Sequence, residues 1–365
     1  MSFSFDCPHR IGSRHDPHAQ TREARQQELL LHSMSVYREL FELVFEHRRI
    51  TTTVEIGVES GRGSAMYAEL GASDVYCVEP EPSDELRSYM GEQDALHLVE
   101  RPSPEALDTI PIADLYIVDG DHNYAVVRRE LDWILNNAPD AVIVLHDVLW
   151  PCARRDLYYE PSSVRPAERH PASADGPTVW HDELTPAGLV GLGAFRTAKH
   201  AGGERNGVIT AVEDALEQAP DDRWHCVLVP AVFGLGLLVR RTDTSAENLV
   251  EALRPYGRSR LLAAMENNRI ALYTRVLQLQ YEAAGRAVDA DRLAEEIARA
   301  SNEKQNLATA LDEAVAESEA LRRQNRLLRQ QLDDLANRTV ANRIRARFRG
   351  TSPGRFAISA EDSPS

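Results

Sequence analysis

The sequence is poor in cysteine and has no long apolar run. Its four cysteines lie far apart among 365 residues and form no C-x-x-C pair, so we expect a reduced, intracellular protein without a structural zinc site. No run of about 18 apolar residues is present that could cross a membrane. Residues 1–21 are polar and lack the apolar core of a signal peptide. Together these absences predict a cytoplasmic protein.

Positive charge is also scarce. Asp and Glu number 57 against 41 for Lys and Arg, and the formal net charge is −16. A nucleic-acid-binding surface needs clustered Lys and Arg, so we expect no nucleic-acid partner for the main body. The length suits one large α/β domain with appended elements rather than several small domains.

Glycines interrupt a β-branched run within residues 53–64, and a helical pattern begins directly after them. A short apolar run, a glycine turn and a helix start are typical of the first strand, loop and helix of a doubly wound sheet, where ligands bind beyond the carboxyl end of the strand. Gly57, Gly61 and Gly63 read G-x-x-x-G-x-G, so the dinucleotide fingerprint G-x-G-x-x-G is absent. The stretch therefore predicts a site for a nucleotide-like molecule, without the dinucleotide spacing.

Two acids accompany these glycines. Glu55 stands two residues before Gly57, and Glu79 follows a second predicted strand, residues 74–78. An acid at that strand end is placed to accept both hydroxyls of a ribose. With these acids, residues 50–245 resemble the class I S-adenosylmethionine-dependent methyltransferases, whose first motif is an acid, one residue and a glycine-rich turn.

The resemblance implies both a fold and a donor site. The fold is α/β, a doubly wound, mostly parallel, seven-stranded Rossmann-like sheet closed by an antiparallel hairpin, here residues 224–229 and 235–240. S-adenosylmethionine is the implied cofactor. The residues implied to bind it are Glu55, Gly57, Gly61, Gly63, Ser64, Glu79, Ser103 and Asp119. Ser103 enters this set only by its position after the third predicted strand, where the family contacts adenine.

Two ionisable clusters follow the fourth and fifth predicted strands, residues 114–118 and 141–145. Their members are Asp119, Asp121 and His122 in the first cluster and His146 and Asp147 in the second. Because neighbouring parallel strands end at the same edge of a sheet, we expect both clusters beside the glycine turn. Carboxylates there could take a proton from a hydroxyl directly, or hold a divalent ion that lowers the pKa of that hydroxyl.

The clusters narrow the resemblance to the magnesium-dependent O-methyltransferases, both the catechol type and the type that methylates sugars of macrolide and aminocoumarin antibiotics. In the sugar group an Asp-Gly-Asp sequence supplies a metal ligand and then a general base, which correspond to Asp119 and Asp121. The metal-binding pair after the fifth strand corresponds to His146 and Asp147. The chain departs from the family at His146, where a carboxylate or an amide is usual, because imidazole is a poorer magnesium ligand.

Two mechanisms are open at this point. In the first, which we favour, Asp119, His146 and Asp147 bind Mg²⁺ or another divalent cation that chelates a vicinal diol. Asp121 then takes the proton. In the second no metal binds, and His146 or His122 is the base. The acids also have structural explanations, since Asp121 could cap the helix that follows it and Asp147 could cap the next segment.

The chain around these motifs divides into segments. Residues 1–21 predict a flexible tail, and residues 22–49 predict a helix packed on the sheet of a methyltransferase domain that spans 22–245. Residues 150–203 form a long insertion rich in Pro, Arg and Tyr, which we interpret as the substrate-binding segment. Trp180 and the paired tyrosines within it could stack on a sugar ring. The alternative is a disordered surface loop.

The chain beyond residue 245 has a different composition. Residues 246–285 predict helices, 286–337 a coiled-coil-like helix, and 338–365 a basic, disordered tail. The d positions of the heptads are Ala300, Leu307, Ala314, Leu321, Leu328 and Leu335, and the a positions are Ile297, Lys304, Leu311, Ser318, Asn325 and Leu332. Half of the a positions are polar, so the segment predicts either a marginal coiled coil that pairs copies of the chain or binds a partner protein, or one exposed helix. The basic end predicts a solvated helix end or weak contact with an anionic membrane surface.

These observations predict an S-adenosylmethionine-dependent O-methyltransferase acting on a hydroxyl of a sugar, glycan or related small molecule. An NAD(P)-dependent oxidoreductase on a similar fold is one alternative, opposed by the glycine spacing and by the absence of a Tyr-x-x-x-Lys pair. A non-catalytic coiled-coil scaffold with a degenerate methyltransferase fold is the other.

Overall fold

The computed structural model of the chain describes residues 12–26, 34–219, 224–241 and 244–349. Contacts within the chain divide it into two compact units, Met1–Ala283 and Ala284–Ser365, and each is described by itself.

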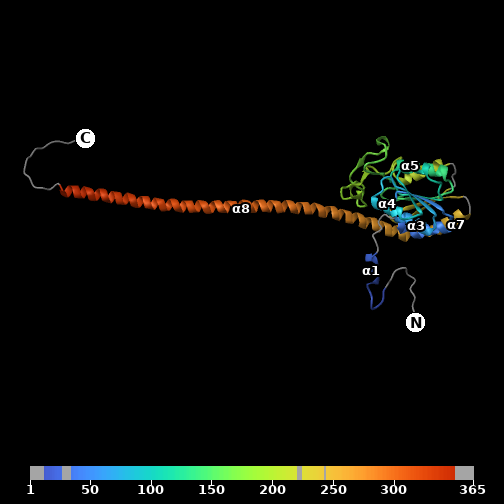
Figure 1. The fold of residues 1–365 in the computed structure, drawn as a ribbon, viewed down its shortest axis with the longest axis horizontal. Coiled ribbons are helices and arrows are strands. Elements are labelled where there is room, and N and C mark those ends of the chain that lie inside the picture. The colour runs from blue at the N-terminus through green and yellow to red at the C-terminus, as the bar shows by residue number, and fades with distance from the viewer. Residues whose placement is uncertain (1–11, 27–33, 220–223, 242–243, 350–365) are drawn as a thin grey trace, which may run out of the picture. The chain divides into compact units, whose positions relative to one another are not determined.

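A sheet with helices packed around it forms the centre of the first unit (Figure 1). The sheet has seven strands in the order β3-β2-β1-β4-β5-β10-β9. The first five strands in this order are parallel, and β10 is antiparallel to both β5 and β9. The strands are β1 Thr52–Ile56, β2 Asp74–Val78, β3 Leu96–Val99, β4 Leu115–Val118, β5 Val142–His146, β9 Trp224–Val229 and β10 Leu235–Arg240. The predicted Rossmann-like sheet and its closing hairpin are therefore confirmed.

Helices pack on both faces of this sheet. Because successive side chains of a strand point to opposite faces, Leu115 and Ile117 of β4 belong to one apolar core and Tyr116 and Val118 to the other. The helices that contribute to the first core are α2 Arg38–His47, α3 Arg62–Leu70, α4 Asp84–Gly91 and α7 Thr244–Gly257, and those of the second are α5 Tyr124–Asn137 and α6 Val208–Gln218. Both faces of the sheet are covered, so the central strand β4 is fully buried. Ionisable side chains collect at and beyond the carboxyl ends of β4 and β5.

The insertion between β5 and α6 is folded. It contains a three-stranded antiparallel sheet of β6 Leu157–Tyr159, β8 Phe195–Ala198 and β7 Ala172–Ser173. Asp156 joins this segment to the main domain, because its buried carboxylate accepts the backbone N–H of Tyr124 at 2.8 Å and of Gly207 at 2.7 Å, and the hydroxyl of Tyr158 at 2.8 Å. The disordered alternative is therefore wrong for this segment.

The single helix predicted over residues 22–49 is interrupted. The structure describes α1 Ala19–Gln26, the 3-10 turn η1 Met34–Tyr37 and α2, which begins directly after that turn. Leu29 and Leu30, two of the apolar positions on which the prediction rested, lie outside the described residues. The turn at Tyr37 directs its side chain toward the β9–β10 connection, which bears on the site below.

Helix α8, Arg260–Arg349, contains 90 residues and begins in the first unit. Within that unit it buries Glu266 and Thr274. In the second unit the described side chains of α8, including those at the predicted heptad positions, are exposed. Residues 338–349 of the predicted tail are helical, and 350–365 lie outside the described residues. None of the helices within the described ranges combines the length and the apolar character needed to span a membrane.

Candidate active site at the carboxyl edge of the sheet

The glycine loop between β1 and α3 lies against the end of β4. Gly57 has a φ of +83°, and a Cβ at this position would stand 2.3 Å from the carbonyl oxygen of Asp119. Its N–H donates to the carbonyl oxygen of Val78 at the end of β2. Only glycine allows this backbone approach. The loop predicted to bind the donor is thereby placed against the first residue of the ionisable cluster.

Glu55, near the end of β1, links this loop to the helix that follows it. Its carboxylate accepts hydrogen bonds from the hydroxyls of Ser64 and Tyr67 on α3, and all three side chains are buried. Gly63 leaves the room that this carboxylate occupies, since a Cβ there would lie 2.5 Å from Glu55 Oε1. Burial raises the pKa of Glu55 to about 8. Glu55, Gly63 and Ser64 therefore shape the loop and the first turn of α3, and Glu55 has no exposed edge with which to meet a ligand.

Glu79 lies on the open side of the same loop. Its carboxylate accepts the backbone N–H of Val58 and of Glu81, each at 3.3 Å, and its side chain is partly exposed. An acid anchored in this way at the end of β2, next to the glycine loop, is where the sequence predicts ribose recognition.

Ser103 follows β3 and faces α5. Its hydroxyl and both carboxylate oxygens of Glu130 on α5 are buried and form no hydrogen bond of standard geometry with the described residues, although the Ser103 hydroxyl is near enough to Glu130 to lower the pKa of that carboxyl. Burial is the largest influence on Glu130 and raises the pKa of its carboxyl to about 7. Asn123 also has its amide nitrogen buried without a partner in the described part of the chain. Ser103 and Glu130 therefore lie next to each other in a buried polar pair.

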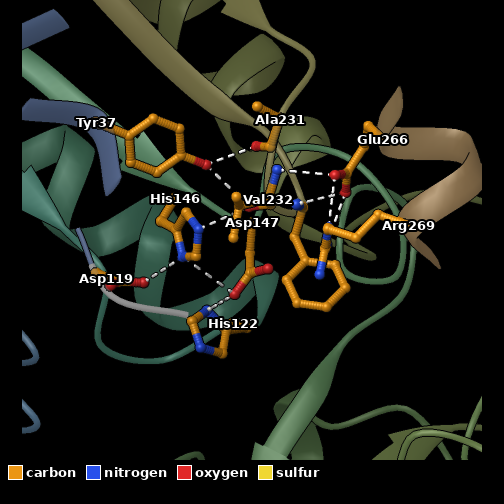
Figure 2. A network of polar contacts seen from close by, with 10 residues as sticks. Tyr37, Asp119, His122, His146, Asp147, Ala231, Val232, Glu266 and Arg269 are labelled. Carbon is orange, nitrogen blue, oxygen red and sulfur yellow. Dashed lines mark hydrogen bonds and ion pairs between the residues drawn. The ribbon is translucent and has the colours of Figure 1, made fainter. Parts of the chain in front are cut away.

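His146 connects the two ionisable clusters (Figure 2). Its Nδ1 lies 2.9 Å from Asp119 Oδ1 and 3.7 Å from Asp147 Oδ2, and its Nε2 lies 2.9 Å from the carbonyl oxygen of Val232. On the far side of Asp147, the Nδ1 of His122 lies 3.2 Å from the same Oδ2. The clusters after β4 and β5 therefore form one network beside the glycine loop, as their positions in the sequence predict.

The surroundings of His146 favour its charged form. Burial by itself lowers the pKa of this imidazole, but the negative charges of Asp119 and Asp147 and the hydrogen bonds to Asp119 and to the Val232 carbonyl raise it to about 10. An acceptor stands opposite each ring nitrogen, so both nitrogens can donate. With only protein groups around it, His146 is protonated at neutral pH and is not available as a base.

The same cluster fits a divalent cation. One ligand atom each from Asp119, His146 and Asp147 lies within 4.8 Å of the other two. Because the Val232 carbonyl can hold the His146 proton on Nε2, Nδ1 can face the two carboxylates as a neutral ligand. One imidazole nitrogen with two carboxylates suits Mn²⁺, Fe²⁺ or Zn²⁺ better than Mg²⁺.

Asp121 is partly buried beside this network and is held by the insertion. Its carboxylate accepts the hydroxyl of Ser163 at 3.0 Å, and burial raises the pKa of its carboxyl. The explanation that Asp121 caps α5 is wrong, because the N-cap is Asn123, whose Oδ1 accepts the N–H of Val126 at 3.0 Å. Asp121 therefore does not cap the N-terminus of α5.

Sequence reasoning missed the groups that hold the far side of His146. The Tyr37 hydroxyl donates to the carbonyl oxygens of Ala231 and Val232 at 2.6 and 2.9 Å. Glu266 of α8 accepts the Val232 N–H at 3.0 Å. These contacts join positions far apart along the chain, and the only local signal is the Glu266-x-x-Arg269 spacing, a common helical ion pair.

Comparisons with known proteins bear on this domain. Residues 54–148 match a family described as Methyltransferase domain. None of the curated proteins matches the chain. The matched segment runs from β1 to the residue after Asp147, so it includes the glycine loop and both ionisable clusters.

Among solved structures, the methyltransferase PaMTH1 of Podospora anserina, bound to S-adenosylhomocysteine, is 16% identical, with a TM-score of 0.37 over 60% of this chain and 86% of its own. A Klebsiella pneumoniae protein described as an O-methyltransferase is 14% identical, with a TM-score of 0.37 over 60% and 86%. The 1,6-didemethyltoxoflavin-N1-methyltransferase of Burkholderia thailandensis is 12% identical, with a TM-score of 0.34 over 61% and 83%. The family match, together with the observed order of the seven strands and the glycine loop at their carboxyl edge, shows that this part of the chain is similar to a methyltransferase domain.

Proposed function

We propose that this protein is an S-adenosylmethionine-dependent methyltransferase that acts on a hydroxyl of a sugar, glycan or related small molecule with the help of a divalent cation. The observation that carries the proposal is the placement of Asp119, His146 and Asp147 directly beside the loop of Gly57. Methyl transfer from a sulfonium needs no metal to activate the donor, because the donor is already reactive. Three potential metal ligands beside the predicted donor site therefore suggest that a cation acts on the acceptor.

The reaction needs an acceptor oxygen in line with the donor methyl and a group that takes its proton. The oxygen–methyl bond forms as the sulfur–methyl bond breaks, and sulfur keeps the electron pair. A cation held by Asp119, His146 and Asp147 would lower the pKa of the bound hydroxyl. Asp121 lies next to this cluster and is not one of the proposed ligands, and Ser163 orients its carboxylate. We therefore assign Asp121 the role of the base that takes the proton of the acceptor hydroxyl.

A metal-independent route with a histidine base is the second candidate. His146 suits it poorly, because its surroundings raise the pKa of the imidazole to about 10. His122 suits it better, since its side chain is only 12% exposed and its Nδ1 is oriented by Asp147. In that route Asp147 would position the histidine instead of holding a cation.

Calorimetry with S-adenosylhomocysteine and added metals separates the two routes. We expect saturable binding of Mn²⁺ or Mg²⁺ to the native protein, loss of that binding in Asp147→Asn, and loss of methyl transfer after treatment with EDTA. Asp140→Asn, an exposed acid that pairs with Arg240, is the matched control. Full activity of the chelated native enzyme would refute the metal-assisted route and favour His122.

The insertion supports the choice of a sugar ring as the acceptor. Tyr159 of β6 is 41% exposed, and its ring centroid lies 6.2 Å from that of His122 and 4.9 Å from that of Phe195. Its neighbour Tyr158 is buried and bonded to Asp156, so only one of the paired tyrosines faces the site. Assays with glycosides and catechols as acceptors test this choice, and methylation of catechols alone would refute it.

We also propose that the second unit pairs two copies of the chain in parallel. The d positions over 300–335 are all apolar, as are three of the six a positions, and all of these side chains are exposed in the second unit. Asn325 occupies an a position, where a buried polar residue favours two strands in a fixed register. Glu317 at a g position lies five residues before Arg322 at an e position, which is the spacing of an ion pair between the two chains of a parallel coiled coil.

Analytical ultracentrifugation of the full chain tests the pairing. We expect a dimer for the native protein and a monomer for Leu328→Glu, whereas Gln330→Glu, on the same turn but outside the a and d positions, should remain dimeric. A native monomer at micromolar concentration would refute the pairing.

A further inference from the structure

The β9–β10 turn that contacts His146 has an unfavourable backbone conformation. Val232 and Phe233 both have positive φ, at 43° and 65°. Non-glycine residues in this region are unfavourable and persist only where their surroundings hold them. Val232 is β-branched, for which a positive φ is least favourable. Some other part of the molecule must therefore maintain this turn.

Helix α8 supplies that support through one carboxylate. Glu266 accepts the N–H of Val232 at 3.0 Å and the N–H of Phe233 at 2.8 Å (Figure 2). Successive backbone N–H groups that converge in this way make an anion-binding nest, and here the anion is a side chain of the protein. The Glu266 side chain is 8% exposed, so these hydrogen bonds are shielded from water.

Arg269 fixes Glu266 and the turn at the same time. Its Nε lies 2.7 Å from Glu266 Oε2 and its Nη2 lies 2.8 Å from Oε1, a bidentate pair. The guanidinium carbon also lies 4.3 Å from the centroid of the Phe233 ring. The carboxylate is thus neutralised and held in place on the side away from the turn.

The opposite end of the turn is bound to the candidate active site. The Val232 carbonyl accepts from His146 Nε2 and from the Tyr37 hydroxyl, both at 2.9 Å. A change in the backbone at Val232 would move this oxygen, and with it the orientation of the imidazole toward Asp119. The peptide groups of Val232 thereby link α8 to the acid cluster.

We propose that Glu266, held by Arg269, is a positioning residue for methyl transfer: it holds the Val232 carbonyl where it orients His146 against Asp119 and Asp147. This inference rests on the proposed role of His146. It assigns a part in the active site to the first turns of α8, outside the segment that matches the methyltransferase family.

The test compares Glu266→Gln with the native full-length enzyme. An amide presents one acceptor and one donor to two N–H groups, so the turn loses a hydrogen bond and meets an unfavourable donor contact. Groups that orient a functional histidine typically contribute about 10- to 100-fold to activity or metal affinity. We expect kcat to fall by that factor and the nitrogen-15 shifts of the His146 ring to change, while affinity for S-adenosylhomocysteine stays native, since the glycine loop is untouched.

Two further variants complete the test. Glu295→Gln, an exposed acid on the same helix, should match the native enzyme in all three measurements. Arg269→Gln should lower kcat less than Glu266→Gln does, because both backbone N–H groups keep their bonds to Glu266. If Glu266→Gln does not fold, Arg269→Gln becomes the test, and a native kcat in that variant would contradict the proposal. A folded Glu266→Gln with native kcat, or parallel losses of kcat and of S-adenosylhomocysteine affinity, would overturn the proposal.

The proposed function can fail separately from this inference. If Asp119→Asn and His146→Gln keep full activity, the acid cluster is not the catalytic centre. If these two variants are inactive while Glu266→Gln and Arg269→Gln are native, the catalytic centre stands and only the positioning role is lost.

Discussion

A Cβ atom on Gly57 would lie 2.3 Å from the carbonyl oxygen of Asp119, so the donor loop and the acid cluster are in backbone contact. No side chain separates the two halves of the site. Movement of either segment must therefore affect the other, and substitutions that enlarge the loop should disturb both donor and metal binding.

Gly57→Ala tests this contact. The added methyl meets backbone atoms that cannot turn aside, and the positive φ alone costs about 1 kcal/mol or more. We expect a lower melting temperature and loss of calorimetric binding of S-adenosylhomocysteine. Gly71→Ala, with a φ of +119° and no atom within 4 Å, should show the conformational cost alone and bind normally. Equal behaviour of the two variants would argue against the contact.

Glu130→Gln should change the pH dependence of stability. Burial raises the pKa of this carboxyl from 4.5 to about 7, so the unfolded chain loses its proton at lower pH than the folded one. The contribution of Glu130 to the free energy of unfolding is therefore complete below pH 4.5 and is lost as the pH rises through 7. At about 1.4 kcal/mol per pKa unit, this loss amounts to up to about 3 kcal/mol. The variant should unfold at higher urea concentration than the native protein at pH 8, with the difference closing at pH 4.5.

The exposed acid Glu217 on α6 provides the control for Glu130, since Glu217→Gln should leave the pH profile unchanged. A Glu130→Gln variant whose urea midpoint follows the native one at every pH would show that the folded protein does not hold this proton.

His146→Asp should alter metal preference. Exchanging an imidazole nitrogen for a carboxylate oxygen removes the donor that favours transition metals. We expect the ratio of Mn²⁺ to Mg²⁺ affinity, measured by calorimetry, to fall relative to the native protein. His200→Asp, at an exposed site in the insertion, should leave the ratio unchanged. An unchanged ratio in His146→Asp would mean that His146 is not a ligand.

Tyr159→Ala should weaken acceptor binding. An aromatic ring stacked on a ligand contributes on the order of 1 kcal/mol, which corresponds to roughly a fivefold rise in the acceptor KM. Affinity for S-adenosylhomocysteine should not change. Trp180→Ala is the comparison, because Trp180 is 55% exposed and has no ring contact in the described structure. A larger effect from Trp180 would move the acceptor site to another part of the insertion.

The sequence predicts the sheet well because its signals are local. The strands at 74–78, 224–229 and 235–240 are found at those residues. Apolar runs bounded by glycine or acid residues mark a parallel strand buried on both faces and its functional end. The convergence of Asp119, His146 and Asp147 also follows from strand adjacency alone.

Contacts between distant segments could not be predicted in the same way. The helical pattern over residues 22–49 does not show that the chain turns at Tyr37, whose hydroxyl bonds to the β9–β10 turn. The burial of Tyr158 beside an exposed Tyr159 depends on strand β6, which has too short a pattern to be found. Glu266 resembles any helix-surface acid until the turn that it supports is in place.

The position of Glu266 has a practical consequence for truncated forms of this protein. A chain cut after β10 would keep all seven strands and the whole family match, and by sequence criteria it would look like an intact catalytic domain. It would nevertheless lack the acid that holds the Val232 peptide. Boundaries for recombinant production should therefore extend at least through Thr274, the last residue that α8 buries.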